Sequence, residues 1–408
     1  MKSLREIYRI GKGPSSSHTM GPQRASQIYA GLHPTAQHFR VTLYGSLAAT
    51  GKGHMTDVAI QEVLSQIAPV EIVWKPEEFL SYHPNAMRFE TEKGEAWVVY
   101  SVGGGALSEG DKPTGFLPPS PDLYDLTNLV DIQHWCDDHG RAYWEYVDRT
   151  EPDIWPYLQQ VWEAMQRAVE RGINHEGRLP GPLNLQRKAA TYYIKAKGYK
   201  QSLQTRALVY AYALAVSEEN ASGGTIVTAP TCGACGVMPA VLYHLSRGHG
   251  FTDEKICHAL ATAGLIGDIV KENASISGAD VGCQGEVGVA CAMASAAACQ
   301  LFGGSPSQIE YAAEMGLEHH LGMTCDPVCG LVQIPCIERN AFAATRALDA
   351  NLYAAFSDGK HRVSFDHVVE VMKETGHDLP SVYKETAPHS CSSSSSLVAA
   401  TAAVWTLP

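Results

Sequence analysis

The sequence predicts an α+β fold, in which an amino-terminal α/β domain is followed by a larger all-α domain. Runs rich in β-branched and aromatic residues are typical of strands, and three of them lie in the first part of the chain: Phe39–Tyr44, Val70–Trp74 and Ala96–Val102. Beyond residue 155 the pattern is almost wholly helical and rich in alanine. The composition changes as well, because six of the seven Trp lie within residues 74–162 and ten of the eleven Cys lie at 232 or later.

The remaining elements follow from periodicity and from breakers. A helical pattern at Asp57–Ile67 lies between two predicted strands, so the first part is α/β. A long amphipathic helix is expected at Trp155–Arg171, and glycines and prolines then separate further helices. These are expected at Gln201–Ser217, Met238–Ser246, Asp253–Ile266, Val287–Leu301, Gln308–Leu317 and Asn340–Tyr353.

The chain is longer than a single core usually supports, so two domains are expected within its 408 residues. We place the first at residues 1–150 and the second at 157–386. A linker at Asp148–Ile154 includes the turn-favouring Glu151-Pro152-Asp153, and a Ser- and Ala-rich tail at 387–408 follows the second domain.

Charge and composition exclude several classes of protein. The net charge of −12 argues against a nucleic-acid or anionic-membrane partner. The apolar run Val287–Ala298 is too short to span a bilayer and predicts a buried helix of small residues. The charged residues after Met1 do not predict a secretory signal, and eleven cysteines are too few for a disulfide scaffold of this size. We therefore expect a cytoplasmic protein with a small-molecule substrate.

The first candidate motif is the loop Gly11–Pro22, which reads GKGPSSSHTMGP. Hydroxyls and backbone N–H groups in such a loop can hold a carboxylate, and His18 is suited to proton transfer near neutral pH. The structural alternative is a serine-rich cap of a helix at Pro22–Tyr29. Further polar loops contain His54, His83 and the glycine-rich Ser101–Gly105, each of which is weak evidence by itself.

The second candidate is the stretch Gly278–Arg339, which holds six cysteines. A thiol-rich block of this kind predicts a metal or iron–sulfur site. Three thiolates on one cluster would leave an open iron that acts as a Lewis acid. Cys291 and Cys299 fall inside the apolar helix and are expected to pack in the core. Cys232 and Cys235 form a C-x-x-C pair, a weak signal for redox chemistry or metal binding.

Six segments occur in this order: SSSHTMGP, GSLAATGKGHMTD, HPN, TIVTAPTCGACGV, NASISGADVGCQGEVGVACAMA and LGMTCDPVCGLVQIPCIERNA. Together they resemble the bacterial iron–sulfur-dependent L-serine dehydratases, in the single-chain form that fuses a β domain to a helical α domain. The resemblance runs from residue 1 to about Thr386.

The resemblance implies removal of water from L-serine, giving pyruvate and ammonia, by an enzyme that forms a homodimer. It implies a [4Fe–4S] cluster held by Cys283, Cys325 and Cys336, with one iron open to substrate. It also implies His18 as the base, with Ser17 beside it and His83 as a second candidate. Substrate-binding roles are implied for Ser15, Ser16, Thr19, His54 and Asn85, at a junction of the two domains.

The chain departs from the family at two places. Cys329 stands where family members often have glycine, so we interpret it as a substitution and not as a ligand. The tail reads APHSCSSSSSLVAATAAVWTLP, where a glycine-rich continuation is expected. In several family members a terminal Cys binds the open iron, and Cys391 is the only thiol available for that position here. A disordered Ser-rich segment is the favoured alternative.

Other classes of function stay open at this point. A pyridoxal-phosphate dehydratase would need a Schiff-base lysine, and no lysine stands in a matching motif. A lyase with the same cluster could instead release sulfide from L-cysteine. A non-catalytic amino-acid-binding protein with a damaged cluster site is the third alternative.

Overall fold

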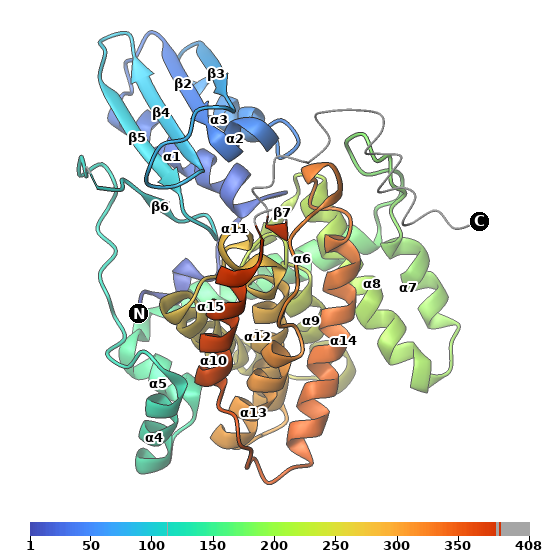
Figure 1. The fold of residues 1–408 in the computed structure, drawn as a ribbon. Coiled ribbons are helices and arrows are strands. Elements are labelled where there is room, and N and C mark those ends of the chain that lie inside the picture. The colour runs from blue at the N-terminus through green and yellow to red at the C-terminus, as the bar shows by residue number, and fades with distance from the viewer. Residues whose placement is uncertain (112, 381–382, 385–408) are drawn as a thin grey trace.

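The computed structural model describes residues 1–111, 113–380 and 383–384, and consists of a sheet body at one end and a larger helical body at the other (Figure 1). The α+β prediction is confirmed, since the sheet is built from the amino-terminal part and helices make up most of the rest. The predicted tail 387–408, with Cys391, lies outside the described residues.

The sheet body contains a five-stranded sheet in the order β3-β2-β4-β5-β6. Strand β2 (Phe39–Tyr44) runs parallel to β3 (Val70–Lys75), with Phe39 opposite Val70. The other neighbours are antiparallel: β4 (Ala86–Thr91), β5 (Ala96–Ser101) and β6 (Leu107–Ser108). The three predicted strands are confirmed. Strand β4 was not predicted, although its alternation of apolar Met87 and Phe89 with polar Arg88 and Glu90 is typical of a half-buried strand.

The core of the sheet body is aromatic. Tyr29 from helix α1 (Gly21–Leu32) stacks on Trp97 of β5 with ring centroids 6.1 Å apart, and it also contacts Phe39 and Phe89. Helix α3 (Thr56–Leu64) adds Ile60 and Leu64 to this core, and α2 (Gly45–Thr50) follows β2 directly. This packing fixes the ends of β2, β4 and β5, from which several candidate site residues project.

The helical body is organised around α12 (Val287–Leu301), which is buried along almost its whole length. Its small side chains let neighbouring helices approach closely. A Cβ atom at Gly316 of α13 (Pro306–Glu318), for example, would lie 2.7 Å from the Cα atom of Ala292. The other predicted helices are also present, as α6 (Trp155–Ile173), α8 (Gln201–Ala221), α9 (Val237–His249), α10 (Asp253–Asn273) and α14 (Cys336–Ala355).

Five further helices were not predicted. Each has 14 residues or fewer, so its apolar pattern repeats over few turns: α4 (Leu129–His139), α5 (Tyr143–Thr150), α7 (Ala189–Lys197), α11 (Gly278–Val281) and α15 (Phe365–Asp378).

The amino-terminal segment ties the two bodies together. Strand β1 (Ile10–Lys12) pairs antiparallel with β7 (Thr225–Val227), the one short strand that the later part of the described chain contributes. Leu4 and Tyr8 are buried in the helical core. The carboxylate of Glu151 accepts hydrogen bonds from the Leu4 N–H (3.1 Å) and the Tyr124 hydroxyl (3.0 Å). The start and the end of the predicted first domain, residues 1–150, thus both pack on the helical body. The domain boundary near residue 150 stays a prediction.

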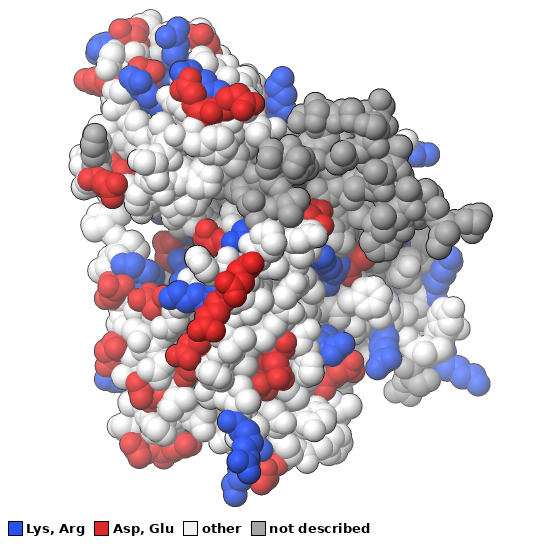
Figure 2. Space-filling view, in the orientation of Figure 1, with Lys and Arg blue, Asp and Glu red and all other residues white. Residues whose placement is uncertain are grey.

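On part of the helical body, acidic side chains are more prominent at the surface than basic ones (Figure 2). Helix α15 carries acids at four-residue spacing, namely Asp366, Glu370, Glu374 and Asp378. Figure 2 shows a row of acidic residues where Figure 1 places this helix. Basic residues on this face lie among acidic ones, which agrees with the net charge. No helix among the described residues is long and apolar enough to cross a membrane.

Candidate active site

The serine-rich loop forms one wall of the site. Residues Ser16–Met20 make a single π-helical turn, η2, that leads directly into α1. The Ser15 hydroxyl accepts a hydrogen bond from the His18 N–H (3.1 Å), and the Thr19 hydroxyl accepts one from the Ser15 N–H (3.1 Å). Ser15 therefore caps this turn, whereas α1, the helix that the structural alternative expected a serine to cap, has Met20 at its N-cap and no side-chain cap. The same turn holds the hydroxyls of Ser16 and Ser17 at fixed positions.

His18 is buried between two hydroxyl groups. Its Nδ1 atom lies 2.8 Å from the Ser17 Oγ atom and its Nε2 atom lies 3.1 Å from the Ser46 Oγ atom. Burial holds the pKa of His18 well below its usual value, and the nearby His54 and His83 lower it further. The ring is therefore neutral at pH 7 and can accept a proton.

His54 lies behind His18, with the two ring centroids 4.7 Å apart. Its backbone carbonyl accepts a hydrogen bond from the Thr19 hydroxyl (2.7 Å), which ties it to the loop. Burial lowers the pKa of His54 to about 4, and neither ring nitrogen has a hydrogen-bond partner among the described residues. His54 thus packs against His18 as a neutral ring.

The HPN segment stands beside this group. The Nδ1 atom of His83 accepts a hydrogen bond from the Asn85 N–H (3.1 Å), and the Asn85 side chain donates to the Ser101 carbonyl (3.4 Å). The Asn85 Oδ1 and Ser101 Oγ atoms are buried without a partner among the residues described. Unpaired buried polar atoms are costly, and they mark a place where a polar ligand would complete the hydrogen bonding.

The helical body supplies the opposite wall, where the three predicted thiols converge. Cys283 lies in the turn η4 (Gly282–Gln284), Cys325 follows α13, and Cys336 is the first residue of α14. The Sγ atoms of Cys283 and Cys325 lie 3.8 Å and 3.7 Å from the Glu286 Oε2 atom. These two sulfurs and a carboxylate oxygen all lie within 4.8 Å of one another.

Arg339 connects Cys336 to the other two thiols. Burial would lower the pKa of Arg339, but the neighbouring thiols of Cys283, Cys336 and Cys325 outweigh burial and keep this pKa above its usual value. The guanidinium donates to the Thr324 carbonyl at 2.7 Å, just before Cys325. A partly buried cation therefore lies beside all three thiols.

A cavity of about 30 Å³ lies where the two walls meet. From the sheet body and its loop it is lined by Ser15, Ser16, Ser17, Gly103 and Gly104, and from the helical body by residues that include Thr231, Glu286, Cys325 and Cys336. Residues about three hundred positions apart in the sequence therefore meet in one site. His18, Thr19, His54, His83 and Asn85 stand behind the serine wall and do not line this cavity.

The donor set fits a thiolate-bound metal group. Three cysteines on separate segments, with one carboxylate among them, are ligands that suit iron–sulfur clusters or zinc. Cys336 begins a long helix, whose amino terminus stabilises a thiolate. A Cβ atom at Gly278 would lie 3.1 Å from the Cys325 sulfur and 2.6 Å from the Glu286 carboxylate, so glycine keeps this place open.

The other cysteines have different surroundings. Cys291 and Cys299 are buried in α12, and burial raises the pKa of each to about 12, so both pack as uncharged thiols. Cys235 is buried with a raised pKa, which disfavours redox chemistry. Cys329 has a φ angle of 57°, a left-handed conformation in which glycine is unstrained. This explains physically why glycine is expected at that position.

Sequence reasoning gave no role to Glu286, Arg339, Ser46 or Thr231. The Thr231 hydroxyl donates to the Glu286 carboxylate at 2.7 Å, and Asn340 bridges the carbonyls of Gly233 (2.7 Å) and Cys336 (2.8 Å). The available signal was their presence inside the recognised segments: Glu286, Arg339 and Thr231 stand in segments that carry cysteines, and Ser46 stands in GSLAATGKGHMTD.

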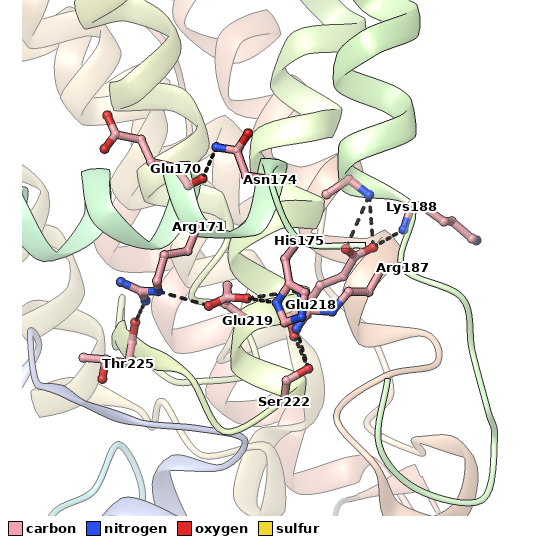
Figure 3. A network of polar contacts seen from close by, with 11 residues as sticks. Glu170, Arg171, Asn174, His175, Arg187, Lys188, Glu218, Glu219, Ser222 and Thr225 are labelled. Atoms are coloured by element: carbon pink, nitrogen blue, oxygen red, sulfur yellow. Dashed lines mark hydrogen bonds and ion pairs between the residues drawn. The ribbon is translucent and has the colours of Figure 1, made fainter. Parts of the chain in front are cut away.

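A buried ion network supports the serine loop from the helical side. Figure 3 shows Glu219 of α8 between Arg171, His175 and Arg187. The Glu219 carboxylate lies 3.1 Å from Arg171 Nε, 3.2 Å from His175 Nδ1 and 3.0 Å from Arg187 Nη1. The next residue, Asn220, donates to the Pro14 carbonyl at 2.9 Å. The network thus fixes the end of α8 against the start of the loop.

Comparison with known proteins gives matches over nearly the whole chain. The family model described as serine dehydratase beta chain matches residues 3–72, and the one described as serine dehydratase alpha chain matches residues 61–391. The L-serine dehydratase TdcG of Escherichia coli is 40% identical, over 95% of this chain and 98% of its own length. L-serine dehydratases of Streptomyces coelicolor (40%, over 94% and 97%) and Helicobacter pylori (35%, over 94% and 97%) are also similar.

Both family models match this one polypeptide, and the chain aligns with almost the full length of these relatives. The matched regions contain both walls of the site, the serine loop and the three thiols. The chain belongs to the serine dehydratase family, with beta-chain and alpha-chain regions joined in a single polypeptide.

Proposed function

We propose that this protein is an L-serine dehydratase that eliminates water from L-serine and releases pyruvate and ammonia. The observation that carries the proposal is the cavity in which the hydroxyls of Ser15, Ser16 and Ser17 face Glu286 and the thiols of Cys325 and Cys336. Relatives named L-serine dehydratase, 35–40% identical over most of the chain, support the same substrate.

In the proposed reaction the Cα–H and Cβ–O bonds of L-serine break and a Cα=Cβ bond forms. Neutral His18 takes the α-proton through Ser17, because Ser17 borders the cavity and His18 lies directly behind it. Ser46 orients the ring through its Nε2 atom. The hydroxyls of Ser15 and Ser16 and the backbone of the Gly103–Gly104 turn are placed to bind the substrate carboxylate. The aminoacrylate product then hydrolyses to pyruvate and ammonium.

The leaving hydroxide needs an electrophile, and the thiol wall is suited to hold one. We propose that Cys283, Cys325 and Cys336 hold a [4Fe–4S] cluster, which when bound supplies Lewis-acid chemistry at the β-hydroxyl. Thr19, His54, His83 and Asn85 then position the base and the loop, since they stand behind the cavity wall.

The test is anaerobic purification, followed by iron and sulfide analysis and an assay of pyruvate formation from L-serine. We expect Cys283→Ala, Cys325→Ala and Cys336→Ala each to lose iron and activity together. Cys291→Ala is the matched control, because its thiol is buried in the core away from the cavity, and it should retain both. Wild-type protein that contains iron but forms no pyruvate from L-serine would contradict the proposal, and pyruvate from L-cysteine alone would favour the cysteine lyase.

We also propose a homodimer in the cytoplasm. Helix α14 and its C-cap residue Phe356 expose large apolar side chains, with Phe342 66%, Tyr353 63% and Phe356 84% exposed. Exposed apolar side chains of this kind mark protein interfaces. Thiolate ligands require a reducing compartment. Light scattering of wild-type protein and of a Phe356→Glu variant tests the dimer, and an unchanged molar mass in the variant would exclude this face.

A further inference from the structure

Glu286 differs from every other residue that borders the active-site cavity. Among the described residues that line it, the rest are hydroxyl, glycine, thiol or apolar side chains, and Glu286 alone carries a carboxyl group. The cavity wall also contains no lysine or arginine within the part of the chain described. An ionic ligand that enters this cavity therefore meets one fixed acidic group.

The carboxyl group of Glu286 is held in place from several sides. The Thr231 hydroxyl donates to its Oε1 atom at 2.7 Å. A Cβ atom at Gly233 would lie 3.0 Å from Oε1, and a Cβ atom at Gly278 would lie 2.6 Å from Oε2. The chain thus uses two glycines to make room for this one side chain. A group built in so tightly can distinguish ligands by the position of a single charge.

L-serine carries an α-ammonium group, a carboxylate and a hydroxyl, and each needs a different partner. The hydroxyls of Ser15–Ser17 and the Gly103–Gly104 backbone suit the carboxylate. An ammonium group presents three donors and a positive charge, and is stabilised in a buried site by an anionic acceptor. Glu286 is the acceptor that this cavity offers.

We propose that Glu286 binds the α-ammonium group of the substrate and so selects amino acids over the corresponding carboxylic acids that lack an amine. This inference rests on the proposed function, since it takes L-serine as the substrate. It also gives a physical use for a buried carboxyl group beside thiols, where an unpaired negative charge would otherwise be unfavourable.

The experiment uses L-alanine and propanoate, which differ only in the α-ammonium group and cannot lose water. Binding of each to the anaerobically purified, iron-containing protein is measured by calorimetry, for wild type, Glu286→Gln and Glu286→Asp. Wild type should bind L-alanine at least about tenfold more tightly than propanoate, as expected for loss of one charge-assisted hydrogen bond. Glu286→Gln should remove most of this preference, and Glu286→Asp, which keeps the charge, should retain part of it.

Two outcomes would overturn the proposal. Equal weakening of both ligands in Glu286→Gln would mean that Glu286 only supports the cavity. A lower iron content in Glu286→Gln would mean that it acts as a metal ligand, as its position 3.7–3.8 Å from two thiol sulfurs allows. Glu314→Gln is the matched control, because Glu314 is a buried acid on α13 that lines a different cavity. Failure of the proposed function is distinct: wild type would then form no pyruvate from L-serine.

Discussion

The Nδ1 atom of His18 lies 2.8 Å from the Ser17 Oγ atom, and only Ser17 of this pair borders the cavity. A proton that leaves the substrate can therefore reach the imidazole by way of the serine hydroxyl. In the proposed reaction Ser17 is therefore part of the proton path, and not only a residue that orients His18.

Ser17→Ala is expected to lower kcat by about 100-fold or more, the effect of losing a positioned proton-transfer group. Its iron content should be unchanged, because Ser17 is on the wall opposite the thiols. The assay is pyruvate formation, with iron analysis of the same sample. Ser26→Ala is the control, since the Ser26 hydroxyl donates within α1 to the Pro22 carbonyl (2.9 Å) and does not line the cavity. A wild-type kcat for Ser17→Ala would refute the relay.

The buried imidazole of His54 makes a prediction about stability and pH. Its pKa is about 4 in the folded protein and about 6.5 when unfolded, so the unfolded state binds more protons between these values. The stability that depends on neutral His54 is complete above pH 6.5 and is lost as pH falls toward 4. Between pH 7.5 and 4.5 this loss is about 2–3 kcal/mol of unfolding free energy.

Urea unfolding of wild type and His54→Gln at both pH values measures this contribution. Buried Asp268, whose pKa is raised by burial to about 7, changes stability in the opposite direction, so the difference between the two proteins is the informative quantity. The wild type should lose more stability on acidification than His54→Gln does. Equal losses would show that His54 protonates in the folded state without cost.

Close packing of the serine loop against α8 predicts that Gly13 cannot be enlarged. A Cβ atom at Gly13 would lie 2.1 Å from the Asn220 Oδ1 atom and 2.4 Å from the Asn220 carbonyl oxygen. Gly13→Ala should therefore displace the loop, lower the free energy of unfolding by a few kcal/mol and reduce activity. Gly31→Ala is the matched control: nothing lies within 4 Å of its Cβ position in α1, so stability should be unchanged or slightly higher.

The sequence was sufficient for elements whose pattern is local. The strand Phe39–Tyr44 and the helix Val287–Leu301 have the predicted bounds, since an alternating or continuous apolar run specifies each of them. The pairing of β1 with β7 could not be predicted in the same way. Both strands have three residues, and their pairing across more than two hundred positions depends on the packing of the two bodies.

The same distinction applies to the site. The loop around His18 and the cysteines Cys283, Cys325 and Cys336 stand in recognisable segments, and the structure brings these segments together. Glu286 gives no periodic signal, and its significance depends on two glycines and a threonine that reach it only in the folded chain. The sequence likewise could not show that Ser17 borders the cavity while His18 lies behind it.

Arg187 gives the prediction that tests how the loop is supported. Its side chain is 1% exposed and its guanidinium donates to Glu219 (3.0 Å) and to the Ser222 hydroxyl (2.8 Å), as Figure 3 shows. Arg187→Met would leave the 8%-exposed Glu219 with two more exposed partners, Arg171 and His175. Removal of one partner from a buried ion pair costs about 3–5 kcal/mol.

We therefore expect Arg187→Met to lower the unfolding free energy by about 3 kcal/mol, because Arg171 retains part of the interaction. Arg247→Met is the control, since the Arg247–Glu170 pair is exposed on both sides and should contribute less than about 1 kcal/mol. Because Asn220 follows Glu219 and holds the Pro14 carbonyl, Arg187→Met should also raise the KM for L-serine at a temperature where the variant is fully folded. A destabilised variant with wild-type KM would mean that the ion network stabilises the helical body without positioning the serine loop.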